Sequence, residues 1–209
     1  MRIVITGTQG LGRVVAEHLA HNHKVTMLSR SEHLLTDDYD AVIHCAGGGL
    51  GLKDPMASSL AFYQLFMANL GRQVEVNRQV LPKMIERKQG YIVHVCSIAS
   101  GEACGSVGYN TMKAALAAYV RSLGREMAPH GVVVTGINPG GFQCPGNAME
   151  RLEKNNPEGY AQFLKKLPRG YMGKAEELLP LIDLLISPAA SMMGGSVIPI
   201  DAGEGSYYS

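Results

Sequence analysis

Short runs of apolar, mostly β-branched residues alternate along this chain with longer segments of helical periodicity. Six such runs lie at Arg2–Thr6, Lys24–Ser29, Ala41–Cys45, Tyr91–Cys96, Val132–Ile137 and Ser196–Ile200. Their almost continuous hydrophobicity is typical of strands that are buried on both faces of a parallel sheet. Helical patterns lie between them, near Leu11–His21, Ser58–Arg87, Tyr109–Met127 and Lys174–Ile186. This order predicts a three-layer α/β/α sandwich around a mostly parallel sheet of about six strands.

The chain has the size and composition of one domain with a sizeable core. It has 209 residues, of which 46% are hydrophobic. No internal repeat, low-complexity tract or Pro/Gly-rich linker divides it, so we expect residues 1–209 to form a single domain. Residues 144–172 differ from the rest, because they are polar and interrupted by Pro145, Pro157 and Pro168. Such a length is unusual for a plain connection, which makes this segment a candidate substrate lid.

Charge and hydropathy exclude several classes of partner. The 19 basic and 18 acidic residues nearly balance, so we expect a small-molecule partner and neither nucleic acid nor a membrane surface. No apolar run reaches the roughly 18 to 20 residues of a membrane span, and the chain opens on a strand pattern, which favours a soluble, cytoplasmic protein. Free thiols and no metal site are expected, because metal-ligand spacing is absent from the four cysteines, Cys45, Cys96, Cys104 and Cys144.

A glycine-rich turn follows the first predicted strand and opens an amphipathic helix. Glycines in such a turn let the backbone approach a pyrophosphate, and the helix N-terminus offers it free N–H groups. A structural turn without a ligand is the alternative, because the motif alone is common. The candidate cofactor-binding residues of this turn are Gly7, Thr8, Gln9, Gly10, Leu11 and Gly12.

A second motif combines serine, tyrosine and lysine. Ser97 ends a predicted strand, and 12 residues later Tyr109 begins a predicted alanine-rich helix that contains Lys113. The four-residue spacing places Tyr109 and Lys113 on one helix face. Tyrosine has a pKa of about 10, so a tyrosine that acts near neutrality needs a neighbouring cation, and Lys113 supplies one. A surface pair is the alternative for YxxxK alone, but its combination with Ser97 and the glycine turn is much rarer.

These motifs resemble those of the short-chain dehydrogenase/reductase family. The cofactor signature TGxxxGxG of that family is one residue shorter here, and its NNAG segment corresponds to His44-Cys45-Ala46-Gly47. The alternative for His44 is a hydrogen-bonded structural histidine. Asn69, which lies 13 residues before Pro82, is similar to the family's asparagine that holds a water in a proton relay.

The resemblance extends to the C-terminal half of the chain. The segment from Asn138 to Pro145 is similar to the family's N/PG segment, which embraces the nicotinamide end, with Cys144 in place of the usual threonine. The stretch from Pro168 to Gly203 also resembles the family's closing helix and strand, so the resemblance covers nearly the whole chain. It implies further cofactor contacts at Cys45, Ala46, Gly47, Tyr109, Lys113, Pro139, Gly140, Phe142 and Cys144.

What the resemblance implies is a Rossmann-like fold and reversible reduction of a ketone or aldehyde with NAD(P)(H). In that reaction Tyr109 donates the proton, Ser97 orients the carbonyl, and Lys113 and Asn69 support the relay. A homodimer or homotetramer is also implied, with pairing through the helix near Ser58 and the helix from Tyr109.

The chain is expected to lack one βα unit of the family. Little more than the ten residues Arg30–Tyr39 separates the second and third strands, where the family places an additional helix, strand and helix. Ten extended residues reach roughly 33 Å, against about 10 Å between strands two positions apart, so the connection is physically allowed. The second strand would then lie at the sheet edge, with Asp37 or Asp38 as a candidate for contact with adenine.

The residues after the second strand bear on the choice of cofactor. Ser29 and Arg30 stand where an acid would bind a ribose 2′-hydroxyl, and arginine instead pairs with a 2′-phosphate. We therefore predict a preference for NADP(H), with NAD(H) as the alternative. If Arg30 is only a solvated edge residue, this preference has no basis.

Two rival functions remain at this stage. A dinucleotide sensor or scaffold of the same fold would fit the shortened adenine side, whereas a nucleotide-sugar epimerase or dehydratase would need a larger C-terminal domain. The substrate itself is open, because the basic residues of the 144–172 segment fit either an acidic substrate or a solvated face. The basic residues considered for this contact are Lys154, Lys165, Lys166 and Arg169.

Overall fold

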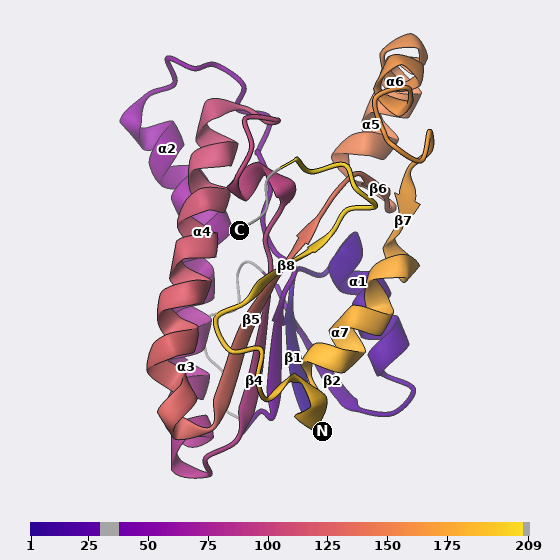
Figure 1. Ribbon diagram of the computed structural model, residues 1–209. Helices are drawn as coiled ribbons and strands as arrows, with labels where there is room; N and C mark the ends of the chain where they lie inside the picture. Colours follow the sequence, from indigo (N-terminus) through magenta and orange to yellow (C-terminus); the bar gives the residue numbers. More distant parts are fainter. Residues whose placement is uncertain (30–37, 207–209) are drawn as a thin grey trace.

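The computed structural model describes residues 1–29 and 38–206, and its centre is a six-stranded parallel sheet (Figure 1). The strand order is β2-β1-β3-β4-β5-β8. The strands are β1 (Arg2–Thr6), β2 (Lys24–Leu28), β3 (Ala41–His44), β4 (Gly90–Val95), β5 (Val132–Pro139) and β8 (Val197–Ile200). Each predicted strand is confirmed to within two residues, and β2 lies at the sheet edge as expected.

Helices cover both faces of the sheet and complete the predicted three layers (Figure 1). One face carries α1 (Leu11–Leu19) and α7 (Leu179–Leu185). The other carries α2 (Ser59–Phe66), the π-helix η1 (Met67–Gly71), α3 (Arg72–Glu86) and α4 (Val107–Met127). Short 3₁₀ helices lie at η2 (Ile98–Ser100), η3 (Ala128–His130), η4 (Ala175–Leu178) and η5 (Pro188–Ala190).

Alternating strand residues build the two cores. In β1, Ile3 and Ile5 belong to the cluster that packs with α1 and α7, whereas Val4 belongs to the cluster with Val76 and Val80 of α3. Successive side chains of a strand point to opposite faces, so a strand buried on both faces needs apolar residues throughout. The continuous apolar pattern of the inner strands therefore indicates that helices cover both faces of the sheet.

The long helix predicted over 58–87 forms as three consecutive segments. It begins at Ser58, whose side chain accepts a hydrogen bond from the Ala61 N–H at 3.3 Å. The helix changes to π-helical hydrogen bonding over the five residues of η1 and then continues as the α-helix α3. Nothing in the sequence analysis indicated this change, although π-helical segments occur frequently at functional sites.

Two helices that the sequence analysis did not predict lie in the 144–172 segment. They are α5 (Ala148–Asn155) and α6 (Pro157–Leu164), which stand away from the sheet in Figure 1 and bury no residue fully. Asn147 and Asn156 cap them by accepting from backbone N–H groups. Pro157 occupies the first turn of a helix, where proline is favoured, so the prolines here start structure as well as interrupt it. The two-residue strands β6 (Phe142–Gln143) and β7 (Gly173–Lys174) pair at the base of the segment.

Candidate active site

The glycine turn after β1 has a geometry that requires glycine. Gly7 and Gly10 adopt φ values of +92° and +56°, which side chains rarely tolerate. A Cβ atom on Gly12 would lie 2.0 Å from the Gly7 carbonyl oxygen, so the helix packs directly on the turn. The Gly7 N–H donates to the Leu28 carbonyl at 3.2 Å and thereby fixes the turn beside the end of β2.

The turn presents an electropositive helix end. The hydrogen bonds of α1 begin with the N–H groups of Arg13 and Val14, which both donate to the Gly10 carbonyl. The N–H groups of Leu11 and Gly12 therefore have no partner within α1. Thr8 and Gln9 are exposed. No acidic residue lies in the first turn of α1. Amide groups that point out of a helix end with no acidic residue in its first turn fit the pyrophosphate of a dinucleotide.

Two cysteines lie against the glycine turn. The Cβ of Cys45 lies 3.3 Å from the position of a Cβ on Gly12, and the Cys144 Sγ lies 3.9 Å from one on Gly10. Burial raises the pKa of Cys45 to about 12, and burial likewise raises the pKa of Cys144. Both thiols are therefore neutral packing groups beside the turn.

Ser97 is held at the carboxyl end of β4. Its N–H donates to Asn138 Oδ1 at 3.1 Å, and the Ser100 hydroxyl donates to the same oxygen at 3.1 Å. Asn138 is 2% exposed at the end of β5. Sequence reasoning quoted Asn138 within the N/PG segment but did not select it. The sequence offered one indication of its role: Asn138 lies at the end of an apolar strand, as Ser97 does at the end of the strand before it.

Tyr109 and Lys113 lie together on α4, as their spacing predicted. The Lys113 side chain is 4% exposed, and its Nζ lies 5.7 Å from the centroid of the Tyr109 ring. Nζ donates to the Val95 carbonyl at 2.8 Å, which places the ammonium at the end of β4, two residues before Ser97. The Lys113 ammonium therefore lies close to both the Tyr109 ring and the strand end that precedes Ser97.

Asn69 uses its whole side chain to hold the loop after β3. Its Nδ2 donates to the carbonyls of Gly48 and Leu65, each at 2.9 Å, and its Oδ1 accepts from the Gly48 N–H at 2.9 Å. The position of a Cβ on Gly47 lies 2.9 Å from Asn69 Oδ1 and 3.5 Å from Lys113 Nζ. Asn69 therefore lies at the predicted site as a clamp on the loop, and its part in a proton relay stays a prediction.

Two glycines that sequence reasoning did not select flank Tyr109. A Cβ on Gly49 would lie 3.9 Å from the Tyr109 Cβ, and one on Gly105 would lie 2.9 Å from the ring. A side chain at Gly105 would crowd the Tyr109 ring, whereas one at Gly49 would begin in ordinary contact with Tyr109. The run of glycines after β3, Gly47 to Gly49, was the visible signal.

The N/PG segment follows β5 and borders a cavity of about 380 Å³. Pro139 ends β5, and Gly140 and Gly141 pack on Glu204, whose carboxylate accepts from the Gly141 N–H. Burial raises the pKa of Glu204, and Asp201 and Glu102 raise it further. Glu204 was absent from the sequence predictions, because nothing in the pattern links the chain end to this segment. The cavity is lined by Phe142, Leu167, Arg169, Tyr171, Lys174 and Ile200, among others.

Of the five basic residues in the 144–172 segment, three are engaged within the protein, and the first of them, Arg151, donates to the Gly146 carbonyl. Lys154 pairs with Glu150 at 3.0 Å. Arg169 pairs with Glu177 at 3.0 Å and lies over the Tyr171 ring at 4.4 Å. Lys165 and Lys166 are exposed.

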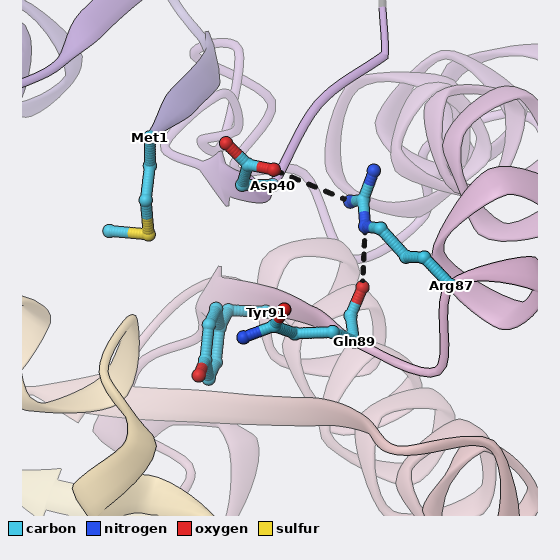
Figure 2. A pocket seen from close by; sticks show the side chains of 5 residues that line it. All are labelled: Met1, Asp40, Arg87, Gln89 and Tyr91. Atoms are coloured by element: carbon cyan, nitrogen blue, oxygen red, sulfur yellow. Dashed lines mark hydrogen bonds and ion pairs between the residues drawn. The ribbon is translucent and has the colours of Figure 1, made fainter.

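The opposite, amino end of the sheet holds a second cavity, of about 290 Å³, which Figure 2 shows. Arg87 lies beside Asp40 there and donates to the Gln89 carbonyl at 2.8 Å. Asp38 pairs with Arg87 and Arg2 at this end. The prediction that Asp38 replaces a lost adenine contact is therefore wrong, because the glycine turn lies at the other end of the sheet. Asp37 and Arg30 lie outside the described residues, whereas Ser29 follows β2 near the turn.

Three general findings complete the description of the site. Cys45, Cys96, Cys104 and Cys144 are free thiols. Within residues 1–29 and 38–206, no three His, Cys, Asp or Glu side chains group as metal ligands. No helix in these ranges combines the length and apolar character that crossing a bilayer requires.

The sequence and the fold both match known proteins. Residues 35–156 match the family model for short chain dehydrogenases. A 3-oxoacyl-(acyl-carrier-protein) reductase of Aquifex aeolicus is 28% identical over 96% of this chain and 86% of its own length. A galactitol 2-dehydrogenase of Rhizobium johnstonii is 30% identical over 86% of this chain and 72% of its own length.

The fold is shared with a short chain dehydrogenase/reductase family oxidoreductase from Burkholderia thailandensis. That structure superposes with a TM-score of 0.88 over 97% of this chain and 92% of its own, at 24% identity. The order of motifs, the parallel sheet and the matching family model agree. This chain belongs to the short chain dehydrogenase family of NAD(P)-dependent oxidoreductases.

Proposed function

We propose that this enzyme reduces a ketone or aldehyde to an alcohol, reversibly and with a preference for NADP(H). The observation that carries the proposal is the buried ammonium of Lys113, held by the Val95 carbonyl at 2.8 Å and 5.7 Å from the centroid of the Tyr109 ring. When bound, the nicotinamide supplies or accepts the hydride.

The protein residues handle the proton and the orientation of the substrate. Ser97 donates its hydroxyl hydrogen to the substrate oxygen, which leaves the carbonyl carbon more electrophilic. Tyr109 donates its phenolic proton to that oxygen in the direction of reduction and removes it in the direction of oxidation. Lys113 stabilises the phenolate that reduction leaves, and Asn69 keeps the Gly48 loop in place beside it.

Dinucleotide binding is supported by the glycine turn and its surroundings. Gly7 to Gly12 would hold the pyrophosphate at the N-terminus of α1, with Ala46 and Gly47 on one side and Gly140 on the other. Cys45 and Cys144 would border the cofactor through packing, since the raised pKa keeps both thiols neutral. Phe142 and Pro139 would then limit the nicotinamide end.

The test of the reaction is a panel of ketones, aldehydes and alcohols, followed by the absorbance of the reduced nicotinamide. Turnover of at least one carbonyl with NADPH is the expected result. If the protein binds NADPH and turns over none of a broad panel, a dinucleotide sensor replaces the enzyme as the better reading. Ser97, Tyr109 and Lys113 together argue against that reading.

The preference for NADP(H) rests on Arg30. Replacing Arg30 with alanine removes one charge-assisted hydrogen bond, worth about 1.5 to 3 kcal/mol, from the 2′-phosphate alone. The dissociation constant of NADPH should therefore rise about 10- to 100-fold, while that of NADH changes little. Calorimetric titration with both cofactors measures this difference. Equal losses for the two cofactors would show that Arg30 does not contact the phosphate.

A homodimer or homotetramer is supported by exposed apolar side chains on α2 and at the start of α4. Leu60 is 64% exposed, Tyr63 59% and Val107 52%. Contiguous apolar surface of this kind is typical of protein–protein contacts. Light scattering at micromolar concentration tests the assembly, and a monomer would contradict it.

A further inference from the structure

Three polar residues lie side by side at the carboxyl end of the sheet, beneath the loop after β3. Thr6, His44 and His94 are register partners on β1, β3 and β4. They are 7%, 0% and 0% exposed, and the two histidine rings stack with centroids 4.6 Å apart. Buried polar groups of this kind need hydrogen-bond partners.

The hydrogen-bond partners of these residues lie on one face of the helix that packs against the sheet. Gln73 and Asn77 follow Asn69 at four-residue intervals through η1 and α3, and both are 1% exposed. Residues four apart share one face of a helix, so the stripe runs along the sheet from the active-site loop. Asn77 and Gln73 each contact one or both histidines.

The Ala46 carbonyl sets the direction of these hydrogen bonds, because it can only accept. Gln73 Nε2 donates to it at 3.2 Å, so Gln73 Oε1 must face the other way, toward His94 Nδ1 at 2.5 Å. His94 Nδ1 therefore carries a hydrogen. In a neutral ring His94 Nε2 then accepts, and Asn77 Nδ2 lies 3.4 Å from it as the donor.

The same logic continues through the second histidine. Because Asn77 Nδ2 faces His94, Asn77 Oδ1 faces His44 Nε2 at 2.9 Å and accepts its hydrogen. His44 Nδ1 is then an acceptor, and the Thr6 hydroxyl lies 3.4 Å from it as the donor. The Thr6 oxygen in turn accepts from the Ala46 N–H at 3.4 Å. The chain closes on the residue where it began, and each hydrogen bond along it joins one donor to one acceptor.

We call this closed chain the Ala46 ring; its members are Thr6, His44, Ala46, Gln73, Asn77 and His94. Both backbone groups of Ala46 are fixed by it. Ala46 also packs on the glycine turn, because a Cβ on Gly7 would lie 3.1 Å from the Ala46 nitrogen. The buried ring thus acts on the backbone at the cofactor cradle without reaching into it.

Charge would break the ring. A second proton on His94 would turn Nε2 into a donor facing the Asn77 NH₂ group. A second proton on His44 would turn Nδ1 into a donor, so the Thr6 oxygen would have to accept from both His44 and Ala46, and the Thr6 hydroxyl hydrogen would lose its acceptor within the ring. Around the two rings the neighbours are one another, Lys113 and Tyr119 from α4, and neutral side chains from β1 and α3. No carboxylate faces either histidine among the described contacts, so nothing there stabilises an imidazolium.

We propose that the Ala46 ring positions the Ala46–Gly47 turn for the dinucleotide by holding His44 and His94 as two fixed, opposite neutral tautomers. His44 carries its hydrogen on Nε2 and His94 on Nδ1. The inference rests on the proposed function only in naming the dinucleotide as the ligand of this turn; the tautomers follow from the hydrogen bonds alone. Thr6, Gln73 and Asn77 are positioning residues in this scheme.

The tautomers can be read directly. In protein labelled with ¹⁵N at histidine, long-range ¹H–¹⁵N spectra should show, among the seven histidines, two that stay neutral from pH 5.5 to 8. Spectra of His44→Gln and His94→Gln assign them. One should be the Nε2–H form and the other the Nδ1–H form. A charged ring, or the same tautomer for both residues, would overturn the proposal whether or not the protein binds a dinucleotide.

The effect on the cofactor is tested with a matched pair at Thr6. Thr6→Val keeps the shape and removes the hydroxyl, whereas Thr6→Ser keeps the hydroxyl. Thr6→Val should raise the dissociation constant of NADPH about tenfold or more and let His44 exchange between tautomers, with kcat at saturating cofactor little changed. Thr6→Ser should restore both. Unchanged affinity in Thr6→Val would contradict the positioning role.

Two controls separate positioning from general loss of stability. Tyr119→Phe removes the Tyr119 hydroxyl, which accepts from Asn77 Nδ2 at 3.1 Å but lies outside the ring, so tautomers and affinity should stay unchanged. Val80→Ala weakens the same helix–sheet core without touching the ring. It should lower the melting temperature while NADPH affinity is kept. If the parent protein binds no dinucleotide although both tautomers are as stated, the proposed function fails and the ring stands.

Discussion

The two ends of the sheet both carry polar clusters, but the clusters are of opposite kinds. At the amino end, Arg2, Asp38, Asp40 and Arg87 are charged, and the side chains of Arg2, Asp38 and Arg87 are 25% to 44% exposed. At the carboxyl end, the side chains of the Ala46 ring, apart from Ala46 itself, are at most 7% exposed and neutral. Water screens the first cluster and is excluded from the second.

The difference shows what burial does to polar side chains. An exposed ion pair tolerates loose geometry, because water replaces a lost partner at little cost. A buried polar group must have its partner in the right direction, since an unpaired one costs about 1 to 3 kcal/mol. Function follows the same division. The glycine turn, Ser97 and Lys113 gather at the buried, directional end, where geometry is fixed.

The largest expected effect is the loss of catalysis in Tyr109→Phe. This change keeps the ring and removes only the phenolic proton, so kcat should fall about 10²- to 10⁴-fold, the usual contribution of general acid–base catalysis. Cofactor affinity and the melting temperature should stay close to those of the parent. A charge change at the opposite end, Arg87→Met, is the matched control and should leave kcat unchanged. Near-normal turnover by Tyr109→Phe would exclude the proposed chemistry.

The second prediction uses acid to separate the two ends. Burial lowers the pKa of His44 to about 4, and burial, His44 and Lys113 lower that of His94 well below its ordinary value. Below pH of about 6.5 the unfolded chain takes up these protons and the folded protein does not, so stability falls as pH falls. The slope is about 1.4 kcal/mol per pH unit for each histidine, so His44 alone removes about 3 kcal/mol between pH 6.5 and 4.

Urea unfolding at pH 7, 6 and 5 measures this slope. His21 is exposed, so His21→Gln serves as the control and should unfold with the same pH dependence as the parent. Stability that stays level between pH 7 and 5 would mean that the two histidines accept protons in the folded protein. The Ala46 ring would then not hold them neutral.

The third prediction concerns Gly12 and its close approach to the turn. In Gly12→Ala the new Cβ overlaps the Gly7 carbonyl oxygen, a backbone atom that cannot move without shifting the turn. We expect a loss of about 1 to 3 kcal/mol in unfolding free energy and weaker NADPH binding. Gly194→Ala is the control, because its Cβ would have its nearest neighbour at an ordinary 3.8 Å. Equal unfolding midpoints for the two variants would contradict the close packing.

Most of the fold could be predicted from sequence, because local pattern and layer structure coincide here. The four inner strands were found because they are buried on both faces and so are apolar nearly throughout, and the edge strands β2 and β8, although only partly buried, keep enough apolar residues to show the same pattern. Ser97, Tyr109 and Lys113 were found by spacing along one strand end and one helix. The α5 and α6 helices were missed for two reasons. The prolines of their segment indicated interruptions, although Pro157 begins a helix. The capping residues Asn147 and Asn156 were not recognised, because an asparagine indicates a helix start only beside a helical pattern.

The Ala46 ring was out of reach for a different reason. His44 was left open between a site residue and a structural one, and Gln73 and Asn77 were not selected. Their role depends on which helix face meets the sheet and on the register of three strands. Single residues carry no signal of that register. The connection to Glu204 was missed for the same reason, since it joins segments 63 residues apart in sequence.

The smallest expected effect is at the charged end of the sheet, in Asp38→Asn. Partial burial opposes ionisation of Asp38, but Arg87, Arg2 and Lys83 together lower its pKa. A carboxylate with a lowered pKa stabilises the folded protein at every pH above its ordinary pKa of about 3.9. That contribution is lost as the pH falls through the lowered pKa, which lies below the pH range in which the histidines act.

Because the pair is partly exposed and screened, Asp38→Asn should cost less stability at pH 7 than Gly12→Ala, and less again in 0.5 M salt. Urea titrations at low and high salt measure this, with NADPH affinity as the second readout. A loss that is insensitive to salt, or any change in NADPH affinity, would show that the two ends of the sheet are not energetically separate.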